Sequence, residues 1–332
     1  MSPHPSGSLL GLGALDESLE ARLADGLARV EQHLRESVRS DYPFVTEASR
    51  HLVDAGGKRF RPLLVLLAAE FGNPRAAGVI PSAVVVELTH LATLYHDDVM
   101  DEADLRRGAA SANARWDNTI AILTGDFLFA KASSILADLG PDAVRMQAQT
   151  FERLCTGQIR ETVGPEGADA VRHHLRVLSD KTGSLIATSG RFGAMMSGAP
   201  TQVVDTMTAF GEQIGVAFQL ADDIVDIASD SRESGKVPGT DLREGVPTLT
   251  GLIALSIDTD PRLQDLLTRP LIDDADHAEA LRRLREHAAL DAARDEARRW
   301  ADRARDTLAD LPEGSAREAL AALCDFVVTR TG

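Results

Sequence analysis

The sequence is poor in the residues that mark disulfide-rich and nucleic-acid-binding proteins. Its 332 residues include two cysteines, Cys155 and Cys324, which argues against a disulfide framework or a thiolate metal site and fits a reducing compartment. Lysine and arginine number 35 against 51 acidic residues, a net charge of −16. A chain this acidic repels phosphate backbones, so we do not expect nucleic acid as a partner.

Long apolar runs are also scarce. The longest strongly apolar stretch, residues 63–71, is far shorter than the ~20 residues that a membrane-spanning helix needs. Residues 1–13 lack the basic segment, apolar run and cleavage site of a signal peptide. We therefore expect a cytoplasmic protein without a transmembrane segment, whose residues 1–14 form a flexible tail.

Alternating and β-branched runs are almost absent, whereas apolar residues recur at spacings of three and four nearly everywhere. This pattern predicts an all-α protein. Without an internal repeat or a linker, a single helical bundle over residues 15–332 is favoured. The predicted helices span residues 16–39, 42–55, 60–71, 81–103, 118–139, 141–162, 170–197, 201–228, 247–256, 261–267, 275–287, 290–311 and 315–329. The least helical interval, 229–246, is expected to form a mobile flap.

Two clusters of aspartates carry the first chemical signal. They are Asp97, Asp98 and Asp101 in HDDVMD, and Asp222, Asp223 and Asp226 in ADDIVD. The first and last members of each cluster lie one helical turn apart on one face, ~6 Å from each other, so both carboxylates can reach the same cation. Mg²⁺ prefers oxygen ligands and commonly bridges carboxylates to substrate phosphates. The alternative, a solvated acidic face, is less favoured because apolar residues surround both clusters.

Two compact basic groups stand out from the acidic average. They are Lys58, Arg59 and Arg61 in GGKRFRP, and Arg106 with Arg107 just after the first aspartate cluster. Arginine matches phosphate oxygens with two hydrogen bonds, lysine supplies a compact charge, and neighbouring glycines let the backbone approach an anion. These groups could hold a diphosphate without metal. A basic surface turn and solvated cations at a helix end are the alternatives.

The motifs GGKRFRP, HDDVMD, RRG, KTGSL and FQLADDIVD occur in the order found in trans-polyprenyl diphosphate synthases, and residues 56–249 resemble that family. The segment LTHLATLYHDDVMDEADLRRG is most similar to long-chain bacterial members. The resemblance implies a single large helical bundle of the isoprenoid synthase type with a central active-site cavity. It also implies a homodimeric prenyltransferase that touches the membrane transiently when it releases product.

The implied reaction adds isopentenyl diphosphate repeatedly to an allylic diphosphate after Mg²⁺-assisted ionisation. The resemblance implies a long-chain product, for a quinone side chain, of about seven to ten isoprene units, each unit spanning about one helical turn. Three alternatives stay open: a short-chain (farnesyl or geranylgeranyl) diphosphate synthase, a class I terpene cyclase, and a non-catalytic subunit of a heterodimeric synthase.

The resemblance also implies roles for individual residues. Three Mg²⁺ ions are expected on Asp97, Asp98, Asp101 and Asp222, with Asp223 and Asp226 completing the second cluster. The allylic diphosphate is expected to contact Arg106, Lys181 and Lys236, and isopentenyl diphosphate to contact Lys58, Arg61, His90 and Arg107. Thr182 and Gln219 match positions that face the forming carbocation. Val246 stands where many relatives have a second flap lysine, which nearby Arg243 could replace.

The length of the product is expected to depend on the helix that leads to Asp97. Ala92 and Thr93, about one turn before Asp97, are both small, whereas short-chain relatives generally place a bulky aromatic at one of these positions. Tyr95 is bulky but points from another face of the helix. We expect the tunnel floor to come from a neighbouring helix, with Met146, Phe151 and Leu154 as candidates.

Three histidines are given no chemical role. His96, His173 and His174 lack partners at metal-ligand spacing and are interpreted as structural or exposed.

Overall fold

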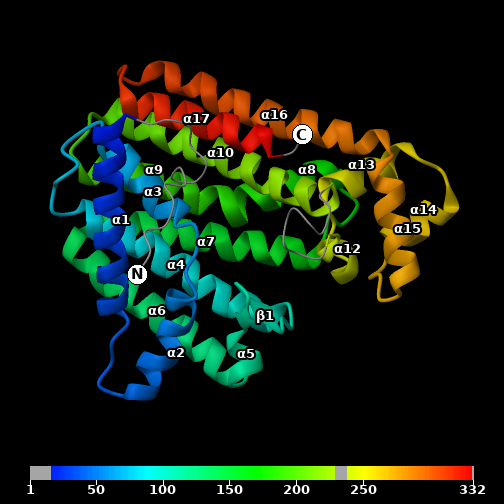
Figure 1. The fold of residues 1–332 in the computed structure, drawn as a ribbon, viewed down its shortest axis with the longest axis horizontal. Helices are drawn as coiled ribbons and strands as arrows, with labels where there is room; N and C mark the ends of the chain where they lie inside the picture. Colours follow the sequence, from blue (N-terminus) through cyan, green and yellow to red (C-terminus); the bar gives the residue numbers. More distant parts are fainter. Residues whose placement is uncertain (1–15, 229–237, 331–332) are drawn as a thin grey trace. The chain divides into compact units, whose positions relative to one another are not determined.

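The computed structural model describes residues 16–228 and 238–330, most of them helical (Figure 1). The only strands in that part of the chain are β1 (Leu105–Arg106) and β2 (Ala109–Ala110), which pair antiparallel. The expected all-α fold class is confirmed. The predicted tail at residues 1–14 lies outside the described residues.

The helices divide between two compact units. Within the described residues, unit 1 comprises residues 16–151, 185–208 and 310–319, and unit 2 comprises residues 152–184, 209–309 and 320–330. The single domain expected over residues 15–332 stays a prediction.

Unit 1 contains α1 (Glu17–Ser37), α2 (Pro43–Asp54), α3 (Phe60–Ala69), α4 (Val79–Met100), α5 (Ala112–Arg115), α6 (Asn118–Leu139) and nearly all of α9 (Ser184–Met196). Unit 2 contains α8 (Ala170–Leu178), the π-helix η2 (Ser179–Gly183), α12 (Thr240–Glu244), α13 (Leu249–Ile257), α14 (Pro261–Leu267), α15 (Asp274–Arg285) and α16 (Ala288–Thr307). Both units include residues of α7 (Pro141–Val163), α10 (Thr201–Ala228), the 3₁₀-helix η3 (Leu308–Asp310) and α17 (Ser315–Thr329).

Helix α4 is the central helix of unit 1. It packs against α6, α3 and α1, and its residues from Val79 to Thr89 are almost all fully buried. A helix that is apolar on every face must lie inside a core, where each buried Val or Leu contributes about 1.5–3 kcal/mol. The core therefore fixes the C-terminal end of α4, which carries Asp97 and Asp98.

Helices α3 and α9 meet through a glycine. A Cβ atom at Gly193 would overlap the carbonyl oxygen of Val65 and lie 2.8 Å from the Cβ of Ala68. Only glycine lets the α9 backbone approach α3 this closely. The contact fixes the position of α3. The loop that precedes α3 carries the first basic group.

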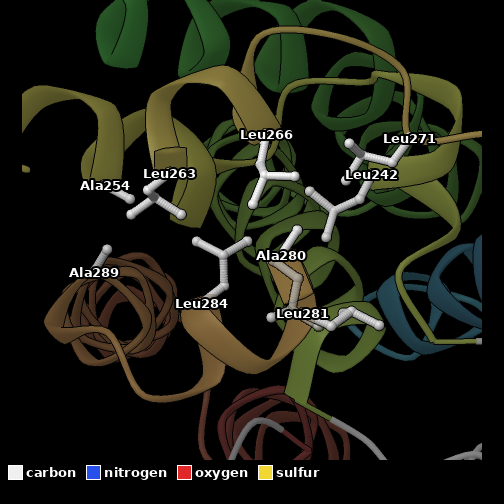
Figure 2. Close-up of a cluster of buried hydrophobic side chains, with 10 residues drawn as sticks. Leu242, Ala254, Leu263, Leu266, Leu271, Ala280, Leu281, Leu284 and Ala289 are labelled. Carbon is white, nitrogen blue, oxygen red and sulfur yellow. The ribbon is translucent and has the colours of Figure 1, made fainter. Parts of the chain in front are cut away.

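The core of unit 2 is a layer of small and branched aliphatic side chains. Figure 2 shows this cluster between the helices α12 to α16, formed by Leu242, Ala254, Leu263, Leu266, Leu271, Ala280, Leu281, Leu284 and Ala289, with Ile227 from the end of α10. Alanines on α15 and α16 leave room for the leucines of α14. This packing anchors the end of the helix that carries the second aspartate cluster.

Most predicted helices agree with the structure within a few residues, and those at 118–139, 201–228, 261–267 and 315–329 have the expected bounds. Two predictions differ. The helix expected over 170–197 is interrupted by the π-helix η2, and the interval 229–246 contains a short helix, α12, in its described part. The hairpin β1–β2 and α5 were not expected.

Helix α6 bears on the expectation that the chain has no transmembrane segment. By length and composition alone α6 could cross a membrane. In the structure, 33% of its most apolar window is buried inside the protein. Ile122 and Leu123 are 42% and 57% exposed. Buried helices of soluble proteins pass the same test, but this one leaves an apolar face uncovered.

The α3–α9 contact makes a stability prediction. Gly193→Ala should lower the free energy of unfolding by about 1–3 kcal/mol, because the added methyl group meets backbone rather than a movable side chain. Gly251→Ala in α13 is the matched control, since its Cβ would meet only the Thr248 hydroxyl at 3.4 Å. The control should be neutral or stabilising by up to about 1 kcal/mol. The measurement is urea unfolding monitored by circular dichroism. Equal unfolding midpoints for the two variants would contradict this packing.

Candidate active site

The first aspartate cluster lies where α4 ends. Asp97 is half-buried, Asp98 is fully buried and Asp101 is exposed at the C-cap. The Oδ1 atom of Asp98 accepts a hydrogen bond from Arg106 Nε at 2.5 Å, whereas its buried Oδ2 atom has no hydrogen-bond partner within residues 16–228 and 238–330. Burial raises the pKa of Asp98 despite the arginine. A buried carboxylate oxygen that accepts no hydrogen bond is suited to bind a hard cation.

The arrangement fits Mg²⁺ better than a metal with a complete protein shell. In the described part of the chain, no three acidic, histidine or cysteine side chains are close enough to hold a metal by themselves. Mg²⁺ keeps several waters and takes one or two carboxylates together with substrate phosphate oxygens. The oxygen donors of Asp97, Asp98 and Asp101 suit that mode of binding.

In the hairpin β1–β2, the neighbouring residues Arg106 and Arg107 contact different partners. Arg106 lies in β1 and pairs with Asp98, and Arg107 has a positive φ of 54° in the turn that Gly108 completes. Arg107 Nη1 donates to the carbonyl oxygens of Leu52, at 3.1 Å, and of Gly56. The hairpin thus links the aspartate cluster to the glycine loop before α3.

Arg59 is the structural member of the first basic group. It is 7% exposed, pairs with Glu87 at 2.7 Å and with Glu31, and donates to the Val53 carbonyl at 2.9 Å. Two carboxylates and a carbonyl leave little capacity for a ligand. The sequence placed Arg59 in a basic group that could hold a diphosphate, but its contacts make it a structural member of that group.

Within the described residues, Arg61, His90 and Arg107 form no such ion pairs. Burial lowers the pKa of Arg61 to about 10, and its Nε atom has no partner among the described residues. Burial, together with the charges of Arg61 and Arg107, holds the pKa of His90 well below its usual value. Burial also lowers the pKa of Arg107. Like charges crowded out of water favour an incoming anion.

The glycine loop explains how these cations come together. Gly56 and Gly57 have φ values of 81° and 148°, and a Cβ atom on Gly57 would lie 3.0 Å from the guanidinium carbon of Arg107. The glycines therefore allow the loop and Arg107 to touch. Lys58 lies in the same loop and is exposed.

The second aspartate cluster lies at the end of α10 in unit 2. Asp222 is 41% exposed and pairs with Arg330 at 2.5 Å, and the Arg330 guanidinium lies 5.0 Å from the centre of the Phe218 ring. Arg330, two residues from the end of the chain, carries no motif that sequence analysis could have recognised. It supplies to Asp222 the charge that Arg106 supplies to Asp98.

The other two aspartates of this cluster face protein groups. Asp223 accepts from Gln219 Nε2 at 3.1 Å and lies 3.6 Å from His174 Nε2, which sequence analysis had given no role. The Asp226 carboxylate accepts from the backbone N–H groups of Thr240 and Asp241, each at 3.3 Å. Asp226 thus caps α12, and Asp222 is the most accessible of the three.

The π-helix brings two more predicted residues to this cluster. Thr182 Oγ1 donates to Gln219 Oε1 at 3.4 Å, and Lys181 Nζ pairs with Glu161 at 2.6 Å. Lys236, expected beside Lys181, lies outside the described residues.

The flap position that departs from the family is exposed. Val246 is 39% exposed, and Arg243, the proposed replacement for the missing lysine, pairs with Asp274 at 2.6 Å. That ion pair is exposed and therefore weak, so it leaves Arg243 able to exchange partners.

The residues expected to limit product length lie on α4. Ala92 is fully buried, and its carbonyl oxygen would lie 3.1 Å from a Cβ on Gly125 of α6. Thr93 is half-buried and donates to the His90 carbonyl. The Tyr95 hydroxyl donates to Ala48 in α2 at 2.5 Å, so Tyr95 points away from the Thr93 face as expected.

The candidate floor residues have different surroundings. Met146 is buried, and Phe151 is half-buried with its ring 4.4 Å from that of Phe129. Leu154 is buried but belongs to unit 2.

Comparisons with known proteins indicate the family of this chain. Residues 42–284 match the model of the Polyprenyl synthetase family. A nonaprenyl diphosphate synthase from Mycobacterium tuberculosis is 49% identical, over 99% of this chain and 99% of that protein.

Solved structures are similar over nearly the whole chain. A geranylgeranyl pyrophosphate synthase from Corynebacterium glutamicum, complexed with calcium and isoprenyl diphosphate, has a TM-score of 0.86 and 47% identity, covering 96% of this chain and 98% of that one. A decaprenyl diphosphate synthase from Rhodobacter capsulatus has a TM-score of 0.87 and 34% identity, covering 95% and 99%. The family match and these near-complete similarities show that the chain belongs to the polyprenyl synthetase family.

Proposed function

We propose that this chain is an all-trans polyprenyl diphosphate synthase that adds isopentenyl diphosphate repeatedly to an allylic diphosphate. The observation that supports this most directly is the pair of half-buried arginines, Arg61 and Arg107, near His90, linked by one hairpin to the aspartates of α4. A cationic site beside a carboxylate site provides for two diphosphates held in different ways, one by protein cations and one through metal.

The cationic group binds isopentenyl diphosphate. The guanidinium groups of Arg61 and Arg107 donate to phosphate oxygens, and Lys58 adds a mobile charge from the loop. His90 is neutral before the anion arrives, because burial and its cationic neighbours oppose protonation. A bound diphosphate offsets the positive charge of Arg61 and Arg107, so its binding is favourable without metal.

The aspartates hold Mg²⁺ for the allylic diphosphate, with three ions proposed per chain. Asp97, Asp98 and Asp101 serve in unit 1 and Asp222 serves in unit 2. Bound Mg²⁺ acts as a Lewis acid that stabilises negative charge on the leaving diphosphate. Arg106 and Lys181 contribute fixed positive charge to the same leaving group.

Thr182 and Gln219 face the allylic carbocation. The Gln219 amide is oriented at both ends, because its N–H group donates to Asp223 and its oxygen accepts from Thr182. A fixed amide and hydroxyl can stabilise positive charge without reorganising. The double bond of isopentenyl diphosphate attacks the cation, and the released diphosphate takes the proton, so no protein base is needed. Apolar walls keep out water that would quench the cation.

The product is proposed to be long-chain, about seven to ten isoprene units, each about one helical turn in length. The small residues Ala92 and Thr93 and the similarity to a nonaprenyl diphosphate synthase support this. The similarity to a geranylgeranyl pyrophosphate synthase favours a shorter product as the second candidate. A non-catalytic subunit is disfavoured because both aspartate clusters are intact.

The exposed face of α6 is proposed to bind a second copy of this chain. Its residues Ile122 and Leu123 form an exposed apolar surface in unit 1 that nothing within residues 16–228 and 238–330 covers. An uncovered apolar face on a protein of this size marks an interaction site. A cytoplasmic location is proposed from the two free thiols, Cys155 and Cys324.

The assignment of the metal ligands makes the first activity prediction. Asp97→Ala and Asp222→Ala should each reduce turnover by more than about 100-fold, because each removes a carboxylate that helps to stabilise the leaving group. Circular dichroism should show unchanged helicity. Asp205→Ala, at an exposed position of α10, is the control and should keep full activity. Near-normal turnover of either variant at ordinary Mg²⁺ concentrations would disprove the two-cluster assignment.

The small residues before Asp97 make a prediction about product length. Thr93→Phe should shorten the product to about three or four isoprene units, since a ring one turn before the aspartates blocks the first added units. Thr93 is preferred to Ala92 because Ala92 is fully buried beside Gly125. Leu94→Phe, on a different face of α4, is the control. Chromatography of the products decides, and an unchanged length for Thr93→Phe would refute the tunnel.

The α6 surface makes a prediction about assembly. The wild type should sediment at twice the 35.6 kDa of the chain, and Ile122→Asp should shift it towards the single chain. A charge placed in an apolar interface must lose its water, which costs several kcal/mol. Ile272→Asp, at a position that is 86% exposed in unit 2, is the control and should remain dimeric. A monomeric wild type would contradict the proposal.

A further inference from the structure

The π-helix η2 is an irregularity that needs external support. It interrupts an otherwise continuous helical stretch and holds Ser179, Asp180, Lys181, Thr182 and Gly183. A π turn has one extra residue compared with an α turn, and such turns occur mostly at functional sites. Here the π turn contains two residues that are assigned to the reaction, Lys181 and Thr182.

Asp180 is the anchor of this turn. Its side chain is 6% exposed and accepts from Arg153 Nε at 3.2 Å and from Arg160, with Arg176 3.5 Å away. A buried carboxylate is stable only when it is paired, and breaking such a pair costs about 3–5 kcal/mol. Both closest partners, Arg153 and Arg160, come from α7.

Arg153 extends the anchor across the turn. Its Nη2 atom donates to Glu212 of α10 at 2.8 Å and to the Ser179 hydroxyl at 3.2 Å, and that hydroxyl donates to the same carboxylate at 2.7 Å. One guanidinium therefore connects α7, the start of the π turn and α10. The network lies entirely in unit 2.

A glycine in α7 allows this close approach. A Cβ atom at Gly157 would lie 2.8 Å from the Lys181 backbone nitrogen and 3.0 Å from Asp180 Cβ. The α7 backbone thus touches the turn between its two arginines. Position 157 excludes any larger side chain unless the turn moves.

Consecutive residues of the turn then point to different partners. Asp180 faces the arginines, Lys181 reaches Glu161 at 2.6 Å, and Thr182 reaches Gln219 at 3.4 Å. The position of each is fixed relative to the next by a single peptide unit. Moving Asp180 must therefore move the two groups that face the allylic substrate.

We propose that Asp180 is a positioning residue, which through Arg153 and Arg160 fixes the π turn and so places Lys181 and Thr182 for the allylic substrate. The proposal rests on the proposed function. Asp180 itself touches no reacting atom.

The test is steady-state kinetics of Asp180→Asn in the full chain, with Mg²⁺ and each substrate varied in turn. The variant keeps the shape of the side chain and removes its charge. We expect kcat to fall by about 10- to 100-fold, the effect of displacing a catalytic group by about 1 Å. The KM for the allylic diphosphate should rise, while the KM for isopentenyl diphosphate stays unchanged. Asp180→Glu, which keeps the charge, should recover part of kcat.

A matched control separates positioning from stability. Asp276 also pairs with two arginines in unit 2, Arg262 at 2.5 Å and Arg269 at 2.6 Å, far in sequence from the turn. Asp276→Asn should leave kcat and both KM values unchanged for the folded enzyme. If Asp180→Asn does not fold, Arg160→Gln carries the same expectations, because its side chain is 37% exposed.

The proposal is overturned if Asp180→Asn behaves like Asp276→Asn, or if it raises the KM values of both substrates equally. A wild type that forms no prenyl product from isopentenyl diphosphate and an allylic diphosphate would instead refute the proposed function. The two failures are therefore distinguishable.

Discussion

Positive charge held away from water is the constraint on which the candidate site depends. Arg59 is neutralised by Glu31 and Glu87 and belongs to the fold. Arg61 and Arg107 form no such ion pair among the described residues, and burial lowers the pKa of each. Burial and these two charges also hold the pKa of His90 well below its usual value. The buried helix α4 and the glycine loop hold these groups together against their repulsion. An anion with several oxygens relieves that repulsion, which is why the fold predisposes the site to bind diphosphate.

The aspartate clusters show the complementary arrangement. In each one an arginine pairs with an aspartate: Arg106 with Asp98, and at the longer distance of 3.9 Å with Asp101, and Arg330 with Asp222. The arginine reduces the repulsion between the carboxylates of its cluster. Under the proposed function, divalent cations neutralise the remaining negative charge. The chain thus balances its own charges only in part, and the substrates complete the balance.

Sequence periodicity predicted the helices well because most are long and amphipathic or wholly apolar, as α4 and α10 are. It did not predict η2, since a π turn is stabilised by Asp180 and its arginines, which are distant in sequence. The hairpin at Arg106 was missed because its strands are two residues long. The motifs identified the aspartates and the basic loop, but not Arg330 or His174, whose roles arise only from tertiary contacts. Family membership, expected from those motifs, is confirmed.

The central claim is that one diphosphate binds to protein cations alone. Titration calorimetry of the full chain with isopentenyl diphosphate in excess chelator tests it most directly. The account predicts saturable binding without divalent metal, since Arg61 and Arg107 supply the charge. Binding that appears only when Mg²⁺ is added would contradict it.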